Sequence, residues 1–178
     1  MKAVATRYAL PLRVLHWITV ALIVVVYLLA EFRGYLPREG GQRALAMQWH
    51  MFLGLFVLLL VLPRIGLRLA QPAPPILPPP ARLLRWAALA THLLLYAFLI
   101  VQPILGLITA QSAERAVVIP LTDWTLPALV GRDNDLHETA EELHEWLGTA
   151  FYFVIGLHAA AALWHHFVVR DNTLRRMV

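Results

Sequence analysis

The chain of 178 residues contains no cysteine. This absence excludes disulfide frameworks, thiolate zinc sites, iron–sulfur clusters and cysteine nucleophiles. Charge is also scarce, because Asp, Glu, Lys and Arg make up 15% of the residues, whereas about 25% is typical of soluble domains. With 60% hydrophobic residues and a mean hydropathy of +0.64, the composition excludes a disordered chain and indicates a membrane protein.

Four long stretches contain no acidic residue, lysine or arginine, and they cover residues 14–30, 44–63, 86–113 and 146–169. A membrane-spanning helix needs about 20 predominantly apolar residues, and all four stretches are long enough. Each is apolar nearly all round, which a soluble helix is not. We therefore predict a single membrane domain over residues 1–178, an all-α four-helix transmembrane bundle. The expected helices run approximately over residues 12–31, 43–63, 83–111 and 139–168.

A proline-rich segment, residues 71–80, joins the second and third expected helices and favours an extended conformation. The N-terminus, this connection and the C-terminus hold ten of the fifteen lysines and arginines but one of the eleven acids, Asp171. Lysine and arginine prefer cytoplasmic loops, so we expect both termini and the proline-rich loop on the cytoplasmic side. The net charge of +4 then reflects membrane topology, and no nucleic acid partner is expected.

Eight histidines are many for so apolar a chain, and most fall within the expected spans. An ionisable residue inside a bilayer indicates function by default. Counting along antiparallel helices, with a rise of about 1.5 Å per residue, places His16 and His158 toward the cytoplasmic side and His50 and His144 toward the outer side. His144 and His158 are fourteen residues apart, so they share a helix face. Two facing imidazoles at one depth suit six-coordinate haem iron, which predicts two stacked sites.

Small residues four positions after three of these histidines leave room for a porphyrin on the same face: Gly54, Gly148 and Ala162. Close helix packing explains the same residues equally well. Zinc is disfavoured, because two separated histidine pairs match neither a closed four-ligand site nor a three-ligand catalytic site. A haem-free membrane protein, such as a small transporter with histidine-mediated packing, remains an alternative.

Five stretches make the chain resemble the bacterial di-haem cytochrome b561 family. They are RVLHW, EFRGYLPR, PAPPILPPP, HLLLYAFLIVQPILGL and FVIGLHAAAALWHHFVVRDNTLRRM, and together they span nearly the whole chain. The resemblance implies two haem b groups. By position, His16 and His158 would ligate the cytoplasmic-side iron and His50 and His144 the outer iron, as the depth argument also indicates.

The resemblance further implies a superoxide:ubiquinone oxidoreductase of the bacterial inner membrane. Such an enzyme oxidises superoxide to oxygen at the periplasmic side and passes the electrons to ubiquinone in the lipid bilayer, and no obligate protein partner is expected. The alternative is a cytochrome b electron-carrier subunit of a larger respiratory dehydrogenase or hydrogenase.

Superoxide is an anion, so positive side chains near the outer haem are expected to attract it. The candidates lie in the loop that leads to His50, and they are Arg33, Arg38 and Arg43. Arg115 and Arg132 are further candidates in the next outer connection. Because the outer side holds five cations and ten acids, any attraction must come from a local patch.

Residues near the cytoplasmic-side haem are candidates for its propionates and for the quinone. Arg13, three residues before His16, is the candidate partner of a propionate. The candidate quinone neighbours are His92, His165 and Trp17.

Two ligand assignments stay open at this point. His92 lies at the depth of His16 and His158 and is an alternative ligand there. His137 competes for the outer iron if the fourth helix begins before residue 139.

Overall fold

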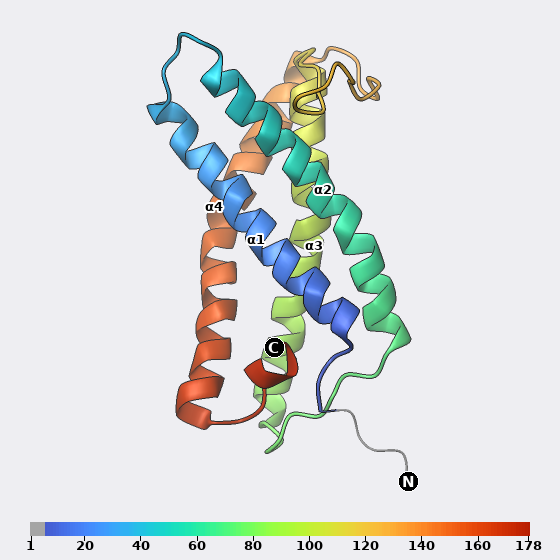
Figure 1. The fold of residues 1–178 in the computed structure, drawn as a ribbon, viewed down its shortest axis with the longest axis vertical. Coiled ribbons are helices and arrows are strands. Elements are labelled where there is room, and N and C mark those ends of the chain that lie inside the picture. Colours follow the sequence, from blue (N-terminus) through green and yellow to red (C-terminus); the bar gives the residue numbers. More distant parts are fainter. Residues whose placement is uncertain (1–5) are drawn as a thin grey trace.

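The computed structural model describes residues 6–178, which form one bundle of four long helices (Figure 1). These are α1 (Leu10–Phe32), α2 (Gln42–Ala70), α3 (Arg82–Ser112) and α4 (Asn134–Trp164). Short elements are the 3-10 helices η1 (Arg33–Tyr35) and η3 (Leu174–Arg176) and the π-helical turn η2 (His165–Val169), which continues α4. Over the described residues the only β pairing is an isolated bridge between Val118 and Thr125, so the predicted all-α fold is confirmed.

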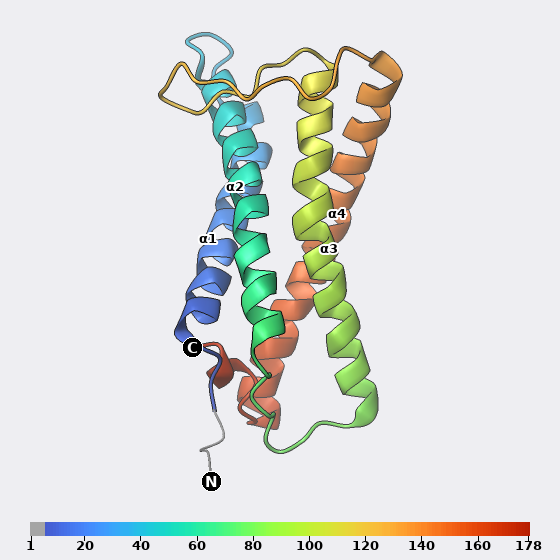
Figure 2. The same cartoon turned by 90° about the vertical axis from the view of Figure 1, so that its right-hand side faces the viewer.

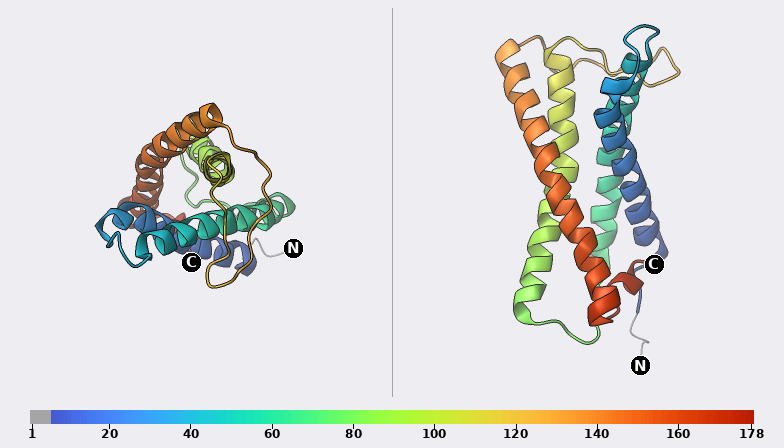
Figure 3. Two further views of the ribbon diagram at one scale, coloured as in Figure 1. Left: turned by 90° about the horizontal axis from the view of Figure 1, so that it is seen from above. Right: turned by 90° about the vertical axis from the view of Figure 1, so that its left-hand side faces the viewer.

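The helices form two antiparallel hairpins, α1 with α2 and α3 with α4, which stand side by side (Figures 2 and 3). Residues 6–9, the proline-rich connection 71–81 and the C-terminal residues 170–178 lie at one end of the bundle, which we call the basic end. The connections 33–41 and 113–133 lie at the other end, which we call the acidic end.

Two helices, α2 and α4, extend several residues beyond a predicted end. We expected α2 to end at Pro63, but it continues to Ala70. Proline removes one backbone N–H, yet ending the helix there would expose several unpaired backbone groups to lipid, so the helix continues. α4 begins at Asn134 because the side chain of Asp133 caps it, accepting a hydrogen bond from the backbone N–H of Leu136 at 3.0 Å.

Large apolar side chains point outward on every helix. Leu28 on α1 is 48% exposed, Leu59 on α2 59%, Leu93 on α3 61% and Phe153 on α4 77%. Soluble proteins rarely expose apolar patches of this extent. All four helices are long and apolar enough to cross a membrane, so the bundle is a multi-pass membrane protein with these side chains toward lipid.

An apolar core lies halfway along the bundle and divides it into two levels. Its buried members Val57, Val61 and Leu99 come from α2 and α3. Phe98 on α3 stacks on Phe151 on α4, with ring centroids 4.0 Å apart and planes at 12°. Phe151 is seven residues after His144 and seven before His158. The core therefore separates one histidine level near the acidic end from another near the basic end.

Candidate functional site

His50 on α2 and His144 on α4 face each other near the acidic end. Their ring centroids are 6.2 Å apart and the ring planes meet at 78°. A metal–imidazole bond is about 2 Å long and the ring centre lies about 1 Å beyond the nitrogen, so two imidazoles on opposite sides of one metal ion have centroids about 6 Å apart. The observed spacing fits one metal ion held between the two rings.

Both rings are oriented by backbone carbonyls of other helices. Nδ1 of His50 lies 3.0 Å from the carbonyl oxygen of Val26, and Nδ1 of His144 lies 3.1 Å from that of Gln102. A carbonyl only accepts hydrogen bonds, so each Nδ1 carries the hydrogen and each Nε2 is free to bind a metal ion. Gln102 also donates from its Nε2 to the carbonyl oxygen of His144 at 2.8 Å, which fixes α3 against α4 at this level.

A cavity of about 380 Å³ surrounds this pair and is lined by glycines from three helices: Gly54, Gly106 and Gly148. A Cβ atom built on Gly54 would meet no atom within 4 Å, whereas one built on Gly106 would lie 3.0 Å from Cε1 of His144. Gly106 thus makes room for the imidazole, and Gly54 leaves open space beside it. Two facing imidazoles within a glycine-lined cavity fit a flat, metal-centred group such as haem. Sequence reasoning missed Gly106, because no histidine of its own helix marks it.

Three histidines meet at the basic-end level. The ring centroids of His16 and His158 are 6.5 Å apart, with planes at 74°, and those of His92 and His158 are 5.4 Å apart. By the spacing argument, the separation of His16 and His158 suits a shared metal ion, and that of His92 and His158 is short. Nδ1 of His92 donates to the carbonyl oxygen of Ala88 on its own helix at 2.6 Å. The centroid spacing favours His16 as the partner of His158. Hydrogen bonding instead leaves Nε2 of His92 free and places Nδ1 of His16 2.9 Å from the donor Nη2 of Arg64.

His137 lies within α4 because the helix begins earlier than expected. Its Nδ1 donates to the carbonyl oxygen of Thr109 on α3 at 2.9 Å, and its Nε2 lies 3.6 Å from a carboxylate oxygen of Glu141. His137 therefore bonds α4 to α3, and the ring that faces His50 is that of His144.

Within residues 6–178, no three His, Asp or Glu side chains gather in a group that would hold a metal ion. Haem iron takes at most two ligands from the protein, so a pair of facing imidazoles would be enough to hold it.

Arginines border the acidic-end cavity, as the sequence predicts, but they are not all the expected ones. Arg33 lines the cavity, and its Nη1 lies 4.0 Å from Sδ of Met47. Arg115, a secondary candidate, also lines it. Both arginines bring positive charge to a cavity that is also lined by Glu31, Glu141 and Glu145.

The other outer arginines have different surroundings. Arg43 donates to the carbonyl oxygens of Leu36 at 2.7 Å and Gly34 at 2.6 Å, so its guanidinium holds the loop between α1 and α2 in place. Arg132 pairs with Glu114 at 3.4 Å, and Arg38 is exposed and is not among the cavity-lining residues.

A buried glutamine fixes the connection that covers the acidic end. Nε2 of Gln111 donates to the carbonyl oxygen of Pro127 at 3.0 Å, and its Oε1 accepts from the backbone N–H groups of Leu129 at 2.9 Å and Val130 at 3.2 Å. Gln111 is 5% exposed. Sequence reasoning missed this residue, whose only signal is a polar side chain near the end of an apolar span.

At the basic end, the C-terminal residues fold back over α1. The guanidinium of Arg13 donates to the carbonyl oxygen of Val178, and Nε1 of Trp17 donates to that of Met177 at 2.8 Å. Two residues that the sequence assigned to a propionate and to the quinone thus also hold the C-terminal residues in place. The positions of Arg13 and Trp17 beside His16 remain compatible with the predicted roles.

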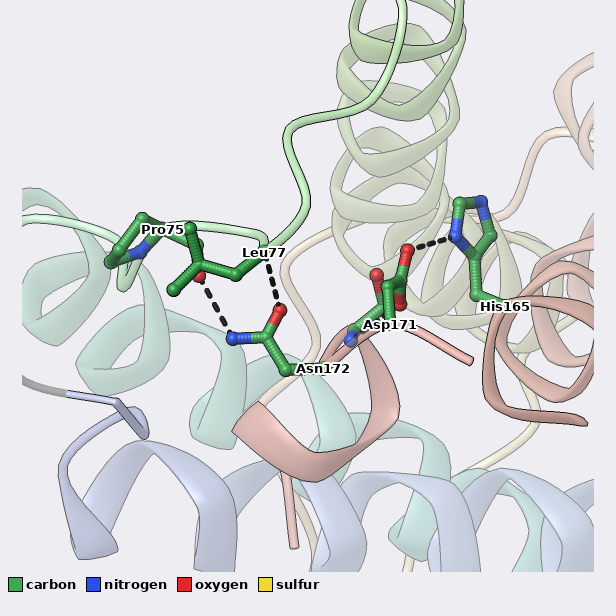
Figure 4. Close-up of polar contacts among 6 residues, drawn as sticks. Pro75, Leu77, His165, Asp171 and Asn172 are labelled. Carbon is green, nitrogen blue, oxygen red and sulfur yellow. Dashed lines mark hydrogen bonds and ion pairs between the residues drawn. The ribbon is translucent and has the colours of Figure 1, made fainter. Parts of the chain in front are cut away.

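His165, a predicted quinone neighbour, begins η2 and lies against a buried carboxylate (Figure 4). Its Nδ1 is 2.6 Å from Oδ2 of Asp171, which is 3% exposed, and the backbone N–H of Thr173 donates to Oδ1 at 2.8 Å. Burial raises the pKa of the Asp171 carboxyl, but hydrogen bonds from Thr173 and His165 outweigh burial, and the net pKa is below its ordinary value. His165 is therefore oriented by an ionised carboxylate.

Asn172 ties the C-terminal residues to the proline-rich connection (Figure 4). Its Nδ2 donates to the carbonyl oxygen of Pro75 at 3.1 Å, and its Oδ1 accepts from the backbone N–H of Leu77 at 2.8 Å. Three segments distant in sequence, the start of α1, the proline-rich connection and the C-terminus, are thereby joined at the basic end.

Known proteins are similar in sequence to this chain over nearly its whole length. Residues 7–178 match the model of a family described as prokaryotic cytochrome b561. The chain is 33% identical to the probable superoxide oxidase CybB of Yersinia pestis, over 92% of this chain and 91% of that protein. It is 31% identical to cytochrome b561 homolog 1 of Escherichia coli (strain K12), over 92% of each chain. The chain therefore belongs to the prokaryotic cytochrome b561 family and is a membrane electron carrier that binds b-type haem.

Proposed function

We propose that the protein is a superoxide:ubiquinone oxidoreductase of the bacterial inner membrane, with its basic end and both termini on the cytoplasmic side. It oxidises superoxide at the acidic end, which faces the periplasm, and reduces ubiquinone at the basic end. The observation that carries the proposal is the presence of two imidazole pairs, one near each end, with centroid separations of 6.2 Å and 6.5 Å. A relative named as a probable superoxide oxidase supports the choice of electron donor.

Two haem b groups are proposed, one between His50 and His144 and the other between His16 and His158. When bound, haem supplies a one-electron carrier at each level. Because each haem would be held by two imidazoles, superoxide would give up its electron without binding to the metal. The protein's part at the acidic end is to admit the anion to the glycine-lined cavity and to attract it with Arg33 and Arg115.

The overall reaction takes two superoxide anions, one ubiquinone and two protons to two oxygen molecules and one ubiquinol. Each superoxide loses one electron, and the quinone gains two electrons and two protons. The proposed quinone neighbours His92, His165 and Trp17 lie at the basic end. Of these, His165 is the proposed proton or hydrogen-bond donor to the quinone, because the carboxylate of Asp171, 2.6 Å from its Nδ1, holds the ring in one orientation.

Purified protein treated with superoxide tests the proposal. We expect two haems per chain, reduction of haem within the mixing time of a superoxide pulse, and one ubiquinol for every two superoxides when ubiquinone is added. Superoxide dismutase, added before the pulse, is the control and should abolish both signals. A colourless protein, or haems that superoxide leaves oxidised, would contradict the proposal. Reduction only in the presence of a copurifying dehydrogenase would indicate the electron-carrier subunit instead.

Arg33→Gln is expected to slow haem reduction by superoxide several-fold and to weaken its dependence on salt. The reason is that Arg33 borders the cavity and positive charge there raises the local concentration of the anion. Stopped-flow absorbance at several ionic strengths measures both effects. Arg38→Gln makes the same change in net charge away from the cavity and serves as the matched control. Equal slowing in the two variants would show that net charge, rather than a local patch, attracts superoxide.

A further inference from the structure

Four side chains at the start of α3 form an open groove on the outside of the bundle. The groove has a volume of about 310 Å³ and is lined by Arg82, Arg85, Trp86 and Leu89. The last three follow Arg82 by three, four and seven positions, so all four lie on one face of the helix. The first turns of α3 stand at the outer edge of the basic end (Figure 2), and every residue from 82 to 90 is exposed. The neighbouring helices therefore leave this face open.

The protein does not balance the positive charge of this groove. The first turn of α3 contains no acidic residue, and no ion pair within residues 6–178 involves Arg82 or Arg85. Like charges three positions apart repel each other, and cations at the start of a helix lie at the positive end of its dipole. Arginine does not lose its proton in proteins, so the repulsion persists at any pH at which the protein is folded. An anion bound beside both guanidinium groups would remove both penalties.

Other arginines at the basic end are engaged by groups of the protein itself. The guanidinium groups of Arg13 and Arg176 donate to backbone carbonyl oxygens. That of Arg68 lies over the ring of Tyr8, 5.9 Å from its centroid. The two arginines of the groove, in contrast, have charge available for a group outside the protein.

The groove face has the polarity of a lipid molecule, from headgroup to acyl chain. Trp86 is 60% exposed, and tryptophan is typical of the level at which headgroups meet hydrocarbon. Further along the same face, Leu89 is 47% exposed and Leu93 61%. Arg82 and Leu93 are eleven residues apart, a rise of about 16 Å, and one leaflet of the hydrocarbon core is about 15 Å thick. The face therefore offers cations at headgroup level and apolar side chains along the depth of one leaflet.

We propose that this groove binds one anionic phospholipid. The phosphate group accepts hydrogen bonds from the guanidinium groups of Arg82 and Arg85 and from the indole N–H of Trp86. The acyl chains lie along Leu89 and Leu93. Arginine suits this site because its planar guanidinium can bind two phosphate oxygens at once. A zwitterionic lipid neutralises less of the charge, because its own amine is positive. The inference requires neither haem nor superoxide, so it stands or fails independently of the proposed function.

The experiment measures lipid binding to the purified full chain in an uncharged detergent. Phosphatidylglycerol and phosphatidylcholine with identical acyl chains are added together, and native mass spectrometry counts the molecules of each that stay bound. The wild type should retain one phosphatidylglycerol with a several-fold preference over phosphatidylcholine. Arg82→Gln/Arg85→Gln should lose this preference. Arg7→Gln/Arg175→Gln removes two exposed charges at the same end but outside the groove, and this matched control should keep the preference.

A conservative variant tests the geometry of the site. Arg82→Lys/Arg85→Lys keeps both charges but loses the paired hydrogen bonds, so it should bind phosphatidylglycerol more weakly than the wild type and still prefer it to phosphatidylcholine. Thermal unfolding separates a lipid from a free anion. Phosphatidylglycerol should raise the Tm of the wild type, whereas inorganic phosphate at the same concentration should leave it unchanged, because phosphate has no acyl chain to cover the leucines.

Three results would overturn the proposal. The first is equal retention of the two lipids by the wild type, and the second is equal loss of preference in the matched control, which would make net charge the cause. The third is an equal rise in Tm with inorganic phosphate, which would indicate a simple anion site. If circular dichroism shows that Arg82→Gln/Arg85→Gln is not folded, Arg85→Gln alone decides, and an unchanged preference in that variant would refute the site.

Discussion

His144→Ala is expected to reduce the haem content of the purified protein from two per chain to one. The imidazole of His144 faces that of His50 at the acidic end, and without it a haem bound there would lose one of its two proposed protein ligands. The basic-end pair lies on the other side of the apolar core and should keep its haem. A haem assay normalised to protein concentration, with the visible spectrum of the reduced protein, measures the change.

His137→Ala is the matched control for this variant. It also removes an imidazole of α4 near the acidic end, but one that donates to Thr109 and does not face His50. This control should keep both haems. Loss of both haems from His144→Ala, or loss of neither, would contradict the assignment of separate pairs. Loss of a haem from His137→Ala alone would make His137 the ligand.

His16→Ala is expected to remove the basic-end haem and to lower ubiquinol formation to the background rate. Superoxide should still reduce the remaining haem, because the cavity at the acidic end is unchanged. Haem content, the superoxide-induced absorbance change and the ubiquinol yield, measured on one preparation, distinguish these effects. Ubiquinol formation at the wild-type rate would show that the basic-end haem is not on the path to the quinone.

His92→Ala tests the alternative partner of His158. Its ring lies 5.4 Å from that of His158, short for two imidazoles on opposite sides of a metal ion, and we expect this variant to keep both haems. A change confined to the kinetics of quinone reduction would fit a place near the quinone. Loss of a haem from His92→Ala but not from His16→Ala would reassign the ligand.

The number of helices and the pairing of the histidines were predictable because both follow from the regular geometry of a membrane-spanning helix. An uncharged stretch of sufficient length indicates a span, and the constant rise of a helix turns sequence distance into depth. The proximity of His50 to His144, and of His16 to His158, follows from that counting. The helix bounds were less predictable, because Pro63 indicates an end that the lipid environment overrides.

Contacts made by loops and by the C-terminal residues were not predictable in this way. Nothing in the spacing of Arg33 and Arg43 indicates that one borders the cavity and the other binds loop carbonyls. Arg64 and Gly106 likewise acquire their significance from neighbours on other helices. Such contacts depend on how helices pack and loops cross the bundle, which no local periodicity encodes.

One helix, α4, supplies an imidazole to each level, and this places a strict condition on its register. His144 and His158 face the same way only because fourteen residues make nearly four whole turns. A single residue inserted between them would rotate one imidazole by about 100° relative to the other and would turn it out of the bundle. The length of the segment from residue 145 to 157 is therefore fixed by the two imidazoles at its ends.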